Sequence, residues 1–206
     1  MQNLPPLFLF FIKKIGVMFK IFMFLMVCIS SSLAFADVEK DTVFSSDGMH
    51  SLHYECADFK CDFWVKDNHA TEVKLLSKIK ARYPAISWLN PSLAQIILSC
   101  GSDCNIKYYY HVKNGLSIPL QQVLAIEANK QCVLLATENG LSLENIYSRK
   151  VRLKIPYTDP SMKFDQSRAV MYVGMEATFD HKGGLILNYT DENSHSRHKY
   201  YKNVCI

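Results

Sequence analysis

The part of the chain after Pro91 consists almost wholly of short β-forming runs. β-Branched and aromatic residues are concentrated in runs that turn formers separate, namely AQIILSC, CNIKYYYHV, QQVLAIEA, QCVLLAT, VRLKIPY, AVMYVGMEATF, GLILNYT and KYYKNVCI. The dipeptides Asn114-Gly115, Asn139-Gly140 and Gly183-Gly184 adopt positive φ easily, as tight hairpin turns require. Strands at spacings of about ten residues predict a mainly β fold: an antiparallel sandwich, a barrel or propeller-like sheets.

One segment before Pro91 has a different pattern. Residues 37–67 contain further short β-like runs, but in ATEVKLLSKIKARYP the apolar residues Val73, Leu76, Ile79 and Tyr83 recur every three to four positions. This spacing predicts one short amphipathic helix that ends at Pro84. A partial alternation of apolar residues in the same run leaves a strand as the alternative.

A short sequence repeat occurs in the β-rich part. NGLSI at 114–118 and NGLSL at 139–143 share four of five letters. Two copies could indicate a repeating sheet. We favour the simpler interpretation that both are hairpin turns.

The first 36 residues have the order of a secretory signal peptide. Lys13, Lys14 and Lys20 precede the apolar run IFMFLMVCI, and Ala34-Phe35-Ala36 forms a small-residue cleavage motif. The apolar run is far shorter than the roughly 20 residues that span a bilayer. We therefore predict a signal peptide at 1–36 and a single exported domain at 37–206, with an uncleaved signal anchor as the alternative.

The start of this segment remains open. Met18 begins a complete short signal on its own, so either Met1 or Met18 can be the first residue. Cys28 does not have the sequence context of a lipid-attachment cysteine, because Val27 rather than a small residue precedes it.

The charge balance argues against a nucleic-acid partner. The chain has 23 basic and 19 acidic residues, and three basic ones lie in the first 36, which leaves 20 against 19. Nucleic-acid binding requires a basic surface that neutralises phosphates. The near-neutral exported domain therefore predicts no nucleic-acid partner.

The exported domain contains an even number of cysteines, which suits disulfides in an oxidising compartment. They are Cys56, Cys61, Cys100, Cys104, Cys132 and Cys205. We predict that Cys56 pairs with Cys61, Cys100 with Cys104 and Cys132 with Cys205. The last bond would close a loop of about 74 residues and stabilise the fold by roughly 4–5 kcal/mol.

Metal and redox roles fit these cysteines poorly. Structural zinc sites use cysteines of reduced proteins, and a redox pair is typically C-x-x-C at the start of a helix. His195 and His198 stand in a polar segment with no apolar period, which predicts a solvated loop rather than a metal site. The sequence thus predicts no metal and no cofactor.

Catalytic motifs are not recognisable in the sequence. It contains no G-x-S-x-G elbow, no phosphate-binding glycine loop and no free cysteine beside a histidine. No catalytic residue is predicted, and we expect a binding protein rather than an enzyme.

Aromatic residues provide the candidate binding positions. Side chains alternate along a strand, so Tyr109 must face away from its neighbours in the run of three tyrosines. Exposed aromatics are enriched at binding surfaces. We name Ser102, Tyr109, Tyr200 and Tyr201 as candidate partner-binding residues, with packing inside a sheet as the alternative for the tyrosines.

These observations predict a periplasmic or secreted, disulfide-bonded module that acts by protein–protein contact. An inhibitor or immunity-type protein of a cell-envelope enzyme is the leading example. A surface-adhesion or envelope-structural subunit is the first alternative. The second is an envelope hydrolase whose site assembles only in the fold.

Overall fold

The computed structural model describes residues 38–101, 104–165 and 172–206, without the side chains of Cys100 and Cys104. All of the named secondary-structure elements in this part of the chain are β-strands, so the predicted mainly β fold is confirmed. No helix in the described ranges is long and apolar enough to cross a membrane. The predicted signal segment lies outside the described residues.

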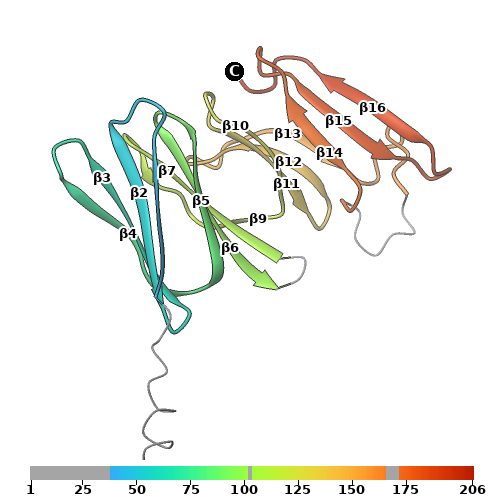
Figure 1. Ribbon diagram of the computed structural model, residues 1–206. Helices are drawn as coiled ribbons and strands as arrows, with labels where there is room; N and C mark the ends of the chain where they lie inside the picture. Colours follow the sequence, from blue (N-terminus) through green and yellow to red (C-terminus); the bar gives the residue numbers. More distant parts are fainter. Residues whose placement is uncertain (1–37, 102–103, 166–171) are drawn as a thin grey trace, which may run out of the picture. The chain divides into compact units, whose positions relative to one another are not determined.

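The strands form successive antiparallel sheets (Figure 1). The first sheet contains β1 (Glu39–Phe44), β2 (His50–Ala57), β3 (Lys60–Asp67) and β4 (Glu72–Lys80). The second contains β5 (Arg82–Asn90), β6 (Leu93–Gly101), β7 (Cys104–His111) and the short strands β8 (Gly115–Leu116) and β9 (Leu120–Gln121). The third contains β10 (Val123–Glu127), β11 (Cys132–Thr137), β12 (Gly140–Asn145) and β13 (Val151–Pro156). The fourth contains β14 (Glu176–Phe179), β15 (Leu185–Thr190) and β16 (Ser196–Tyr201).

Three apolar clusters join neighbouring sheets face to face. Leu52 and Phe63 of the first sheet share a cluster with Ile96 of the second. The opposite face of the second sheet shares a cluster with the third, and the third shares one with the fourth. The first strands of neighbouring sheets also lie together, β1 beside β5 and β10 beside β14. Of the three predicted architectures, this organisation matches propeller-like sheets.

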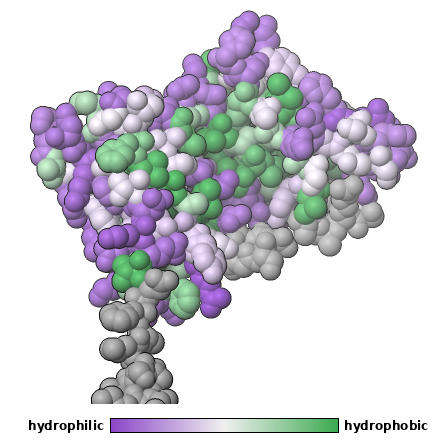
Figure 2. Space-filling model, viewed as in Figure 1, coloured by the Kyte–Doolittle hydropathy of each residue, from purple (hydrophilic) through white to green (hydrophobic). Residues whose placement is uncertain are grey.

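The outward faces of the first and last sheets are polar. On the first sheet His53, Trp64 and Lys74 are cross-strand neighbours on the face away from the apolar cluster. On the fourth, Asn188 and His198 are paired in the same way. Figure 2 shows hydrophilic residues over the first sheet and β16, with hydrophobic residues gathered between them. A polar outer face is what the end layers of a stack of sheets need in water.

The predicted helix at 70–84 is wrong, since residues 72–80 form strand β4. Val73, Leu76 and Ile79 lie opposite Val65, Phe63 and Cys61 of β3, so a spacing of three on one strand faces a spacing of two on the other. Two register shifts produce this mismatch. The bulges therefore gave a strand the apolar spacing of a helix.

Two of the predicted disulfides are confirmed. Cys56 is bonded to Cys61 across the β2–β3 pair, and Cys132 of β11 is bonded to Cys205 near the C-terminus. All four cysteines are buried in apolar clusters. Bonds of this kind fit an oxidising compartment. The predicted pairing of Cys100 with Cys104 lies outside the described side chains.

The two NGLS segments are hairpin turns, as we favoured. Gly115 pairs with His111 at the β7–β8 turn, and Gly140 pairs with Thr137 at the β11–β12 turn. The first turn leads to the last strand of its sheet, whereas the second leads to the third strand of four. The repeated letters therefore occupy different positions in their sheets.

Candidate interaction surface

The β2–β3 hairpin ends in a two-residue turn with an unusual residue at its tip. Ala57 pairs with Lys60, and both Asp58 and Phe59 between them have positive φ, 51° and 60°. Such turns favour glycine at the second position, and the left-handed conformation costs other residues roughly 1–2 kcal/mol. Phe59 nevertheless occupies it, with 60% of its surface exposed. Strain of this kind is concentrated at functional sites.

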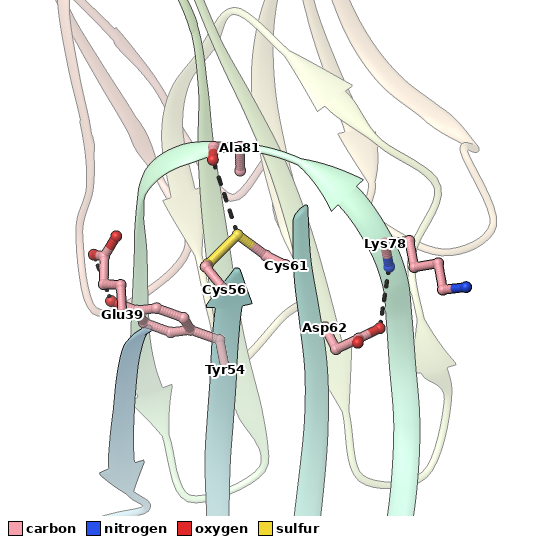
Figure 3. Close-up of a disulfide and its surroundings, with 7 residues drawn as sticks. All are labelled: Glu39, Tyr54, Cys56, Cys61, Asp62, Lys78 and Ala81. Atoms are coloured by element: carbon pink, nitrogen blue, oxygen red, sulfur yellow. Dashed lines mark hydrogen bonds between the residues drawn. A yellow bond between two sulfur atoms is a disulfide. The ribbon is translucent and has the colours of Figure 1, made fainter. Parts of the chain in front are cut away.

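Covalent and hydrogen-bond contacts hold this turn in place (Figure 3). Cys56 and Cys61 are directly paired residues with Cα atoms 4.0 Å apart, and their disulfide closes the hairpin behind the tip. The Ala81 N–H donates a 2.9 Å hydrogen bond to the Phe59 carbonyl oxygen. Cys61 Sγ lies 3.9 Å from the Ala81 carbonyl oxygen, a van der Waals contact because a bonded sulfur has no proton. The tip is therefore fixed to the β4–β5 connection.

Strand β5 begins at Arg82, and the Arg82 side chain lies beside Phe59. The guanidinium carbon of Arg82 lies over the Phe59 ring, 4.7 Å from its centre. The next residue, Tyr83, is 83% exposed and also has positive φ, 51°. Two large aromatic residues in left-handed conformation thus stand exposed at one end of neighbouring sheets. We call Phe59, Lys60, Lys80, Arg82 and Tyr83 the Phe59 surface.

The charge on the Phe59 surface is positive. Lys60 and Lys80 are directly paired across β3 and β4, and both are exposed, as is Arg82. Asp58 is the neighbouring acidic residue at the tip. Arginine and aromatic residues dominate the binding energy of protein interfaces, and a basic rim attracts acidic partners.

A hydrogen bond between β3 and β4 positions the strand that leads to the Phe59 surface. Asp62 of β3 accepts a 3.0 Å hydrogen bond from the backbone N–H of Lys78, a left-handed bulge residue (Figure 3). Hydrogen bonds from Ser77 and Lys78 lower the pKa of Asp62, and its ion pair with Lys74 acts in the same direction. The ionised carboxylate therefore holds the bulge that leads to Lys80.

Ser102 and Tyr109 are two of the predicted partner-binding residues, and neither is part of an exposed surface that the structure describes. Ser102 lies outside the described residues. The prediction for Tyr109 is wrong, because its exposed fraction is 0%. Tyr109 packs toward the third sheet while Tyr108 and Tyr110 pack toward the first, so the predicted alternation holds. The second sheet is packed on both faces at β7, so the three tyrosines of this strand face neighbouring sheets rather than solvent.

Tyr200 and Tyr201 point in opposite directions from β16. Tyr200 is 45% exposed, and its hydroxyl donates a 2.8 Å hydrogen bond to Asp180 Oδ2. Its ring lies over Gly184, where an added Cβ would be only 2.5 Å from the hydroxyl oxygen. The Tyr201 side chain packs against the cluster between the third and fourth sheets. A binding role for these two residues stays a prediction.

A shallow hollow of about 490 Å³ on the outer face of the first sheet contains a histidine. The His53 ring stacks on Trp64, and its nitrogens lie 2.8 Å from Thr42 Oγ1 and 2.7 Å from Ser51 Oγ. Burial and then the Lys66 charge lower the pKa of His53. Ser51 is only 8% exposed and does not line the hollow, so this serine–histidine contact is not placed to attack a substrate.

Only part of the segment that contains His195 and His198 is the loop that we predicted. Residues 191–195 form a turn around Asp191, whereas His198 lies on β16. The backbone N–H groups of His195 and Asn193 and the Arg197 side chain hold the pKa of Asp191 at about 2. Within the described ranges no three His, Cys, Asp or Glu side chains are close enough together to hold a metal ion.

Sequence reasoning missed Phe59, Arg82 and Tyr83. The signal for Phe59 was present, because a Cys56–Cys61 bond with four intervening residues leaves room only for a tight turn at 58–59. The signal for Tyr83 was hidden, because Tyr83 fitted the apolar spacing of the predicted helix.

Comparisons with known proteins add little to this geometry. No family model matches the chain, and no curated protein matches it. Among solved structures, the crystal structure of TolB from Acinetobacter baumannii matches with 12% identity and a TM-score of 0.32. The match covers 80% of this chain and 43% of that one, so the chain spans less than half of its length. At this identity and score the likeness does not indicate a function.

Proposed function

We propose that the protein is an exported module that binds a protein partner through the Phe59 surface. One observation carries the proposal: a disulfide-closed hairpin presents a strained, 60% exposed phenylalanine with Arg82 over its ring. Rigid presentation lowers the entropy lost on binding, and aromatic and arginine side chains supply most of the energy of an interface.

The sequence and the sulfur chemistry support an exported location. The signal-like segment at 1–36 supports export, and the disulfides suit the periplasm or the outside of the cell. The partner is a protein of the envelope or of the surroundings, and an inhibitor or immunity-type role toward an envelope enzyme agrees with this placement. The basic rim of the Phe59 surface favours an acidic surface on that partner.

Photo-crosslinking in the producing cells tests the proposal. p-Benzoylphenylalanine replaces Phe59 in one strain and Phe44 in another; Phe44 is a matched control because it is 67% exposed and lies at the opposite end of the first sheet. We expect one dominant protein adduct at position 59 and none at position 44. Equal adducts at both positions, or none at either, would refute the proposed surface.

A further inference from the structure

The third sheet has an open edge at β13. The strand order of this sheet ends there, and no described strand pairs with the outer side of β13. An unpaired edge presents a row of backbone N–H and C=O groups that an extended segment of another chain can pair with.

A groove of about 600 Å³ lies along the same edge. Gly140, Ser142 and Glu144 of β12 line it from the middle of the sheet, and Val151 and Lys154 line it from β13. Lys154 pairs with Ser142, and a register shift brings Val151 opposite Glu144. Gly140 has no side chain and Ser142 has a small one, so β12 leaves a hollow beside the open strand.

Two acidic residues line the groove: Glu138 is exposed at the β11–β12 turn, whereas Glu144 is neutralised by its partners. Glu144 is only 8% exposed, and both of its oxygens have partners: Ser142 Oγ donates to Oε1 and Arg149 Nε donates to Oε2, each at 2.7 Å. A buried carboxylate with such partners offers little repulsion to an incoming anion.

The open edge itself is basic. Lys150, Arg152 and Lys154 are all exposed, and none forms an ion pair with a residue in the described ranges. The groove also offers Val151, which is 41% exposed, as an apolar contact. The edge thus combines free backbone groups, unpaired cations and a hollow for alternate side chains.

We propose that β13 and its groove bind an extended acidic segment of a protein partner, which adds to the third sheet as a further strand. Main-chain hydrogen bonds to β13 would hold the segment, and its acidic side chains would meet Lys150, Arg152 and Lys154. This site lies on a different sheet from the Phe59 surface, and it does not depend on the function proposed for that surface.

Binding of a peptide of defined sequence to the exported form of the protein, purified from cells, tests the site. The probe is a fluorescein-labelled nonapeptide in which glutamate and valine alternate, and the readouts are fluorescence anisotropy and amide hydrogen exchange in β13. We expect saturable binding, slower exchange of β13 amides, and affinity about tenfold weaker after Arg152→Glu with Lys154→Glu. The control Lys182→Glu makes one such charge reversal at the exposed β14–β15 turn, half the charge change of the double variant, and should leave affinity unchanged.

A second peptide separates strand addition from simple charge attraction. The same nonapeptide with N-methyl groups at alternate residues keeps its charges but cannot complete the ladder, so we expect it not to bind. Equal binding of both peptides, or binding that Lys182→Glu weakens as much, overturns the proposal. Absence of binding, with aggregation of an Arg152→Val, Lys154→Val variant, would also overturn it and would assign the basic edge to protection against self-association.

Discussion

The Arg82 guanidinium lies 4.7 Å from the centre of the Phe59 ring, and the two residues belong to different sheets. Phe59 is at the tip of the first sheet, whereas Arg82 begins β5 of the second. A cation–π contact at an exposed site stabilises by roughly 0.5–1 kcal/mol. It therefore favours this orientation of the ring without burying it.

Replacement of Phe59 by glycine should separate stability from binding. Glycine adopts the φ of 60° without the cost of roughly 1–2 kcal/mol that phenylalanine incurs, and the lost Arg82 contact offsets part of that gain. We expect Phe59→Gly to unfold in urea with unchanged or up to about 1 kcal/mol higher free energy, while partner binding is lost.

The control for this change is Ala57→Gly, in the adjoining strand. Glycine weakens an extended strand by roughly 0.5–1 kcal/mol, so this variant should be less stable. If Phe59→Gly were destabilised by more than Ala57→Gly, the ring would serve the fold rather than a partner.

The two disulfides should differ in their contribution to stability. The Cys132–Cys205 bond joins residues 73 apart and the Cys56–Cys61 bond residues 5 apart, so chain entropy gives roughly 4–5 kcal/mol for the first and about 2 kcal/mol for the second. Denaturant unfolding of Cys132→Ala, Cys205→Ala and of Cys56→Ala, Cys61→Ala measures this difference. The reverse order would contradict the entropic account.

His53 should make stability depend on pH. Its folded-state pKa lies below the ordinary value of 6.5, so the unfolded chain takes up the proton first as the pH falls. Its contribution is full above pH 6.5 and decreases as the pH falls below that value. We expect His53→Gln to reduce the loss of unfolding free energy between pH 7.5 and 5, measured by urea unfolding at each pH.

Another histidine limits how much of the pH dependence the His53→Gln change can remove. Burial also lowers the pKa of His111, so the His53→Gln variant should keep part of the slope. An unchanged slope in His53→Gln would show that the His53 environment does not disfavour its charge.

Export and processing can be tested at the protein level. We expect N-terminal sequencing of the protein recovered from the periplasm or medium to begin at Asp37, because the A-x-A motif ends at Ala36. Alanine-to-arginine changes at Ala34 and Ala36 should block this cleavage. A protein that retains residues 21–29 in the membrane fraction would support the anchor instead.

The sequence predicted the fold class and the Cys56–Cys61 disulfide because both depend on local information. Strand composition and turn dipeptides identify hairpins, and Cys56 and Cys61 are close enough in sequence to bridge one. The error at residues 72–80 arose because bulges changed the period of β4 from two to three, and a bulge depends on the partner strand.

The interaction surface was harder to predict for a different reason. Burial of Tyr109 depends on how many sheets cover its own sheet, and this is not encoded in the run of three tyrosines. Phe59 and Arg82 are 23 positions apart and meet only because β4 returns the chain to the hairpin tip. Long-range contacts of this kind follow from topology rather than from local pattern.

The affinity of the crosslinked partner for two matched variants tests the central proposal most directly. Isothermal titration would compare the exported protein with its Phe59→Ala and Phe44→Ala variants, both of which lose an exposed ring. We predict that Phe59→Ala weakens binding by about 2 kcal/mol or more, as at a hot spot, and that Phe44→Ala has no effect. Equal affinities of the wild type and Phe59→Ala would contradict the assignment of the Phe59 surface as the binding site.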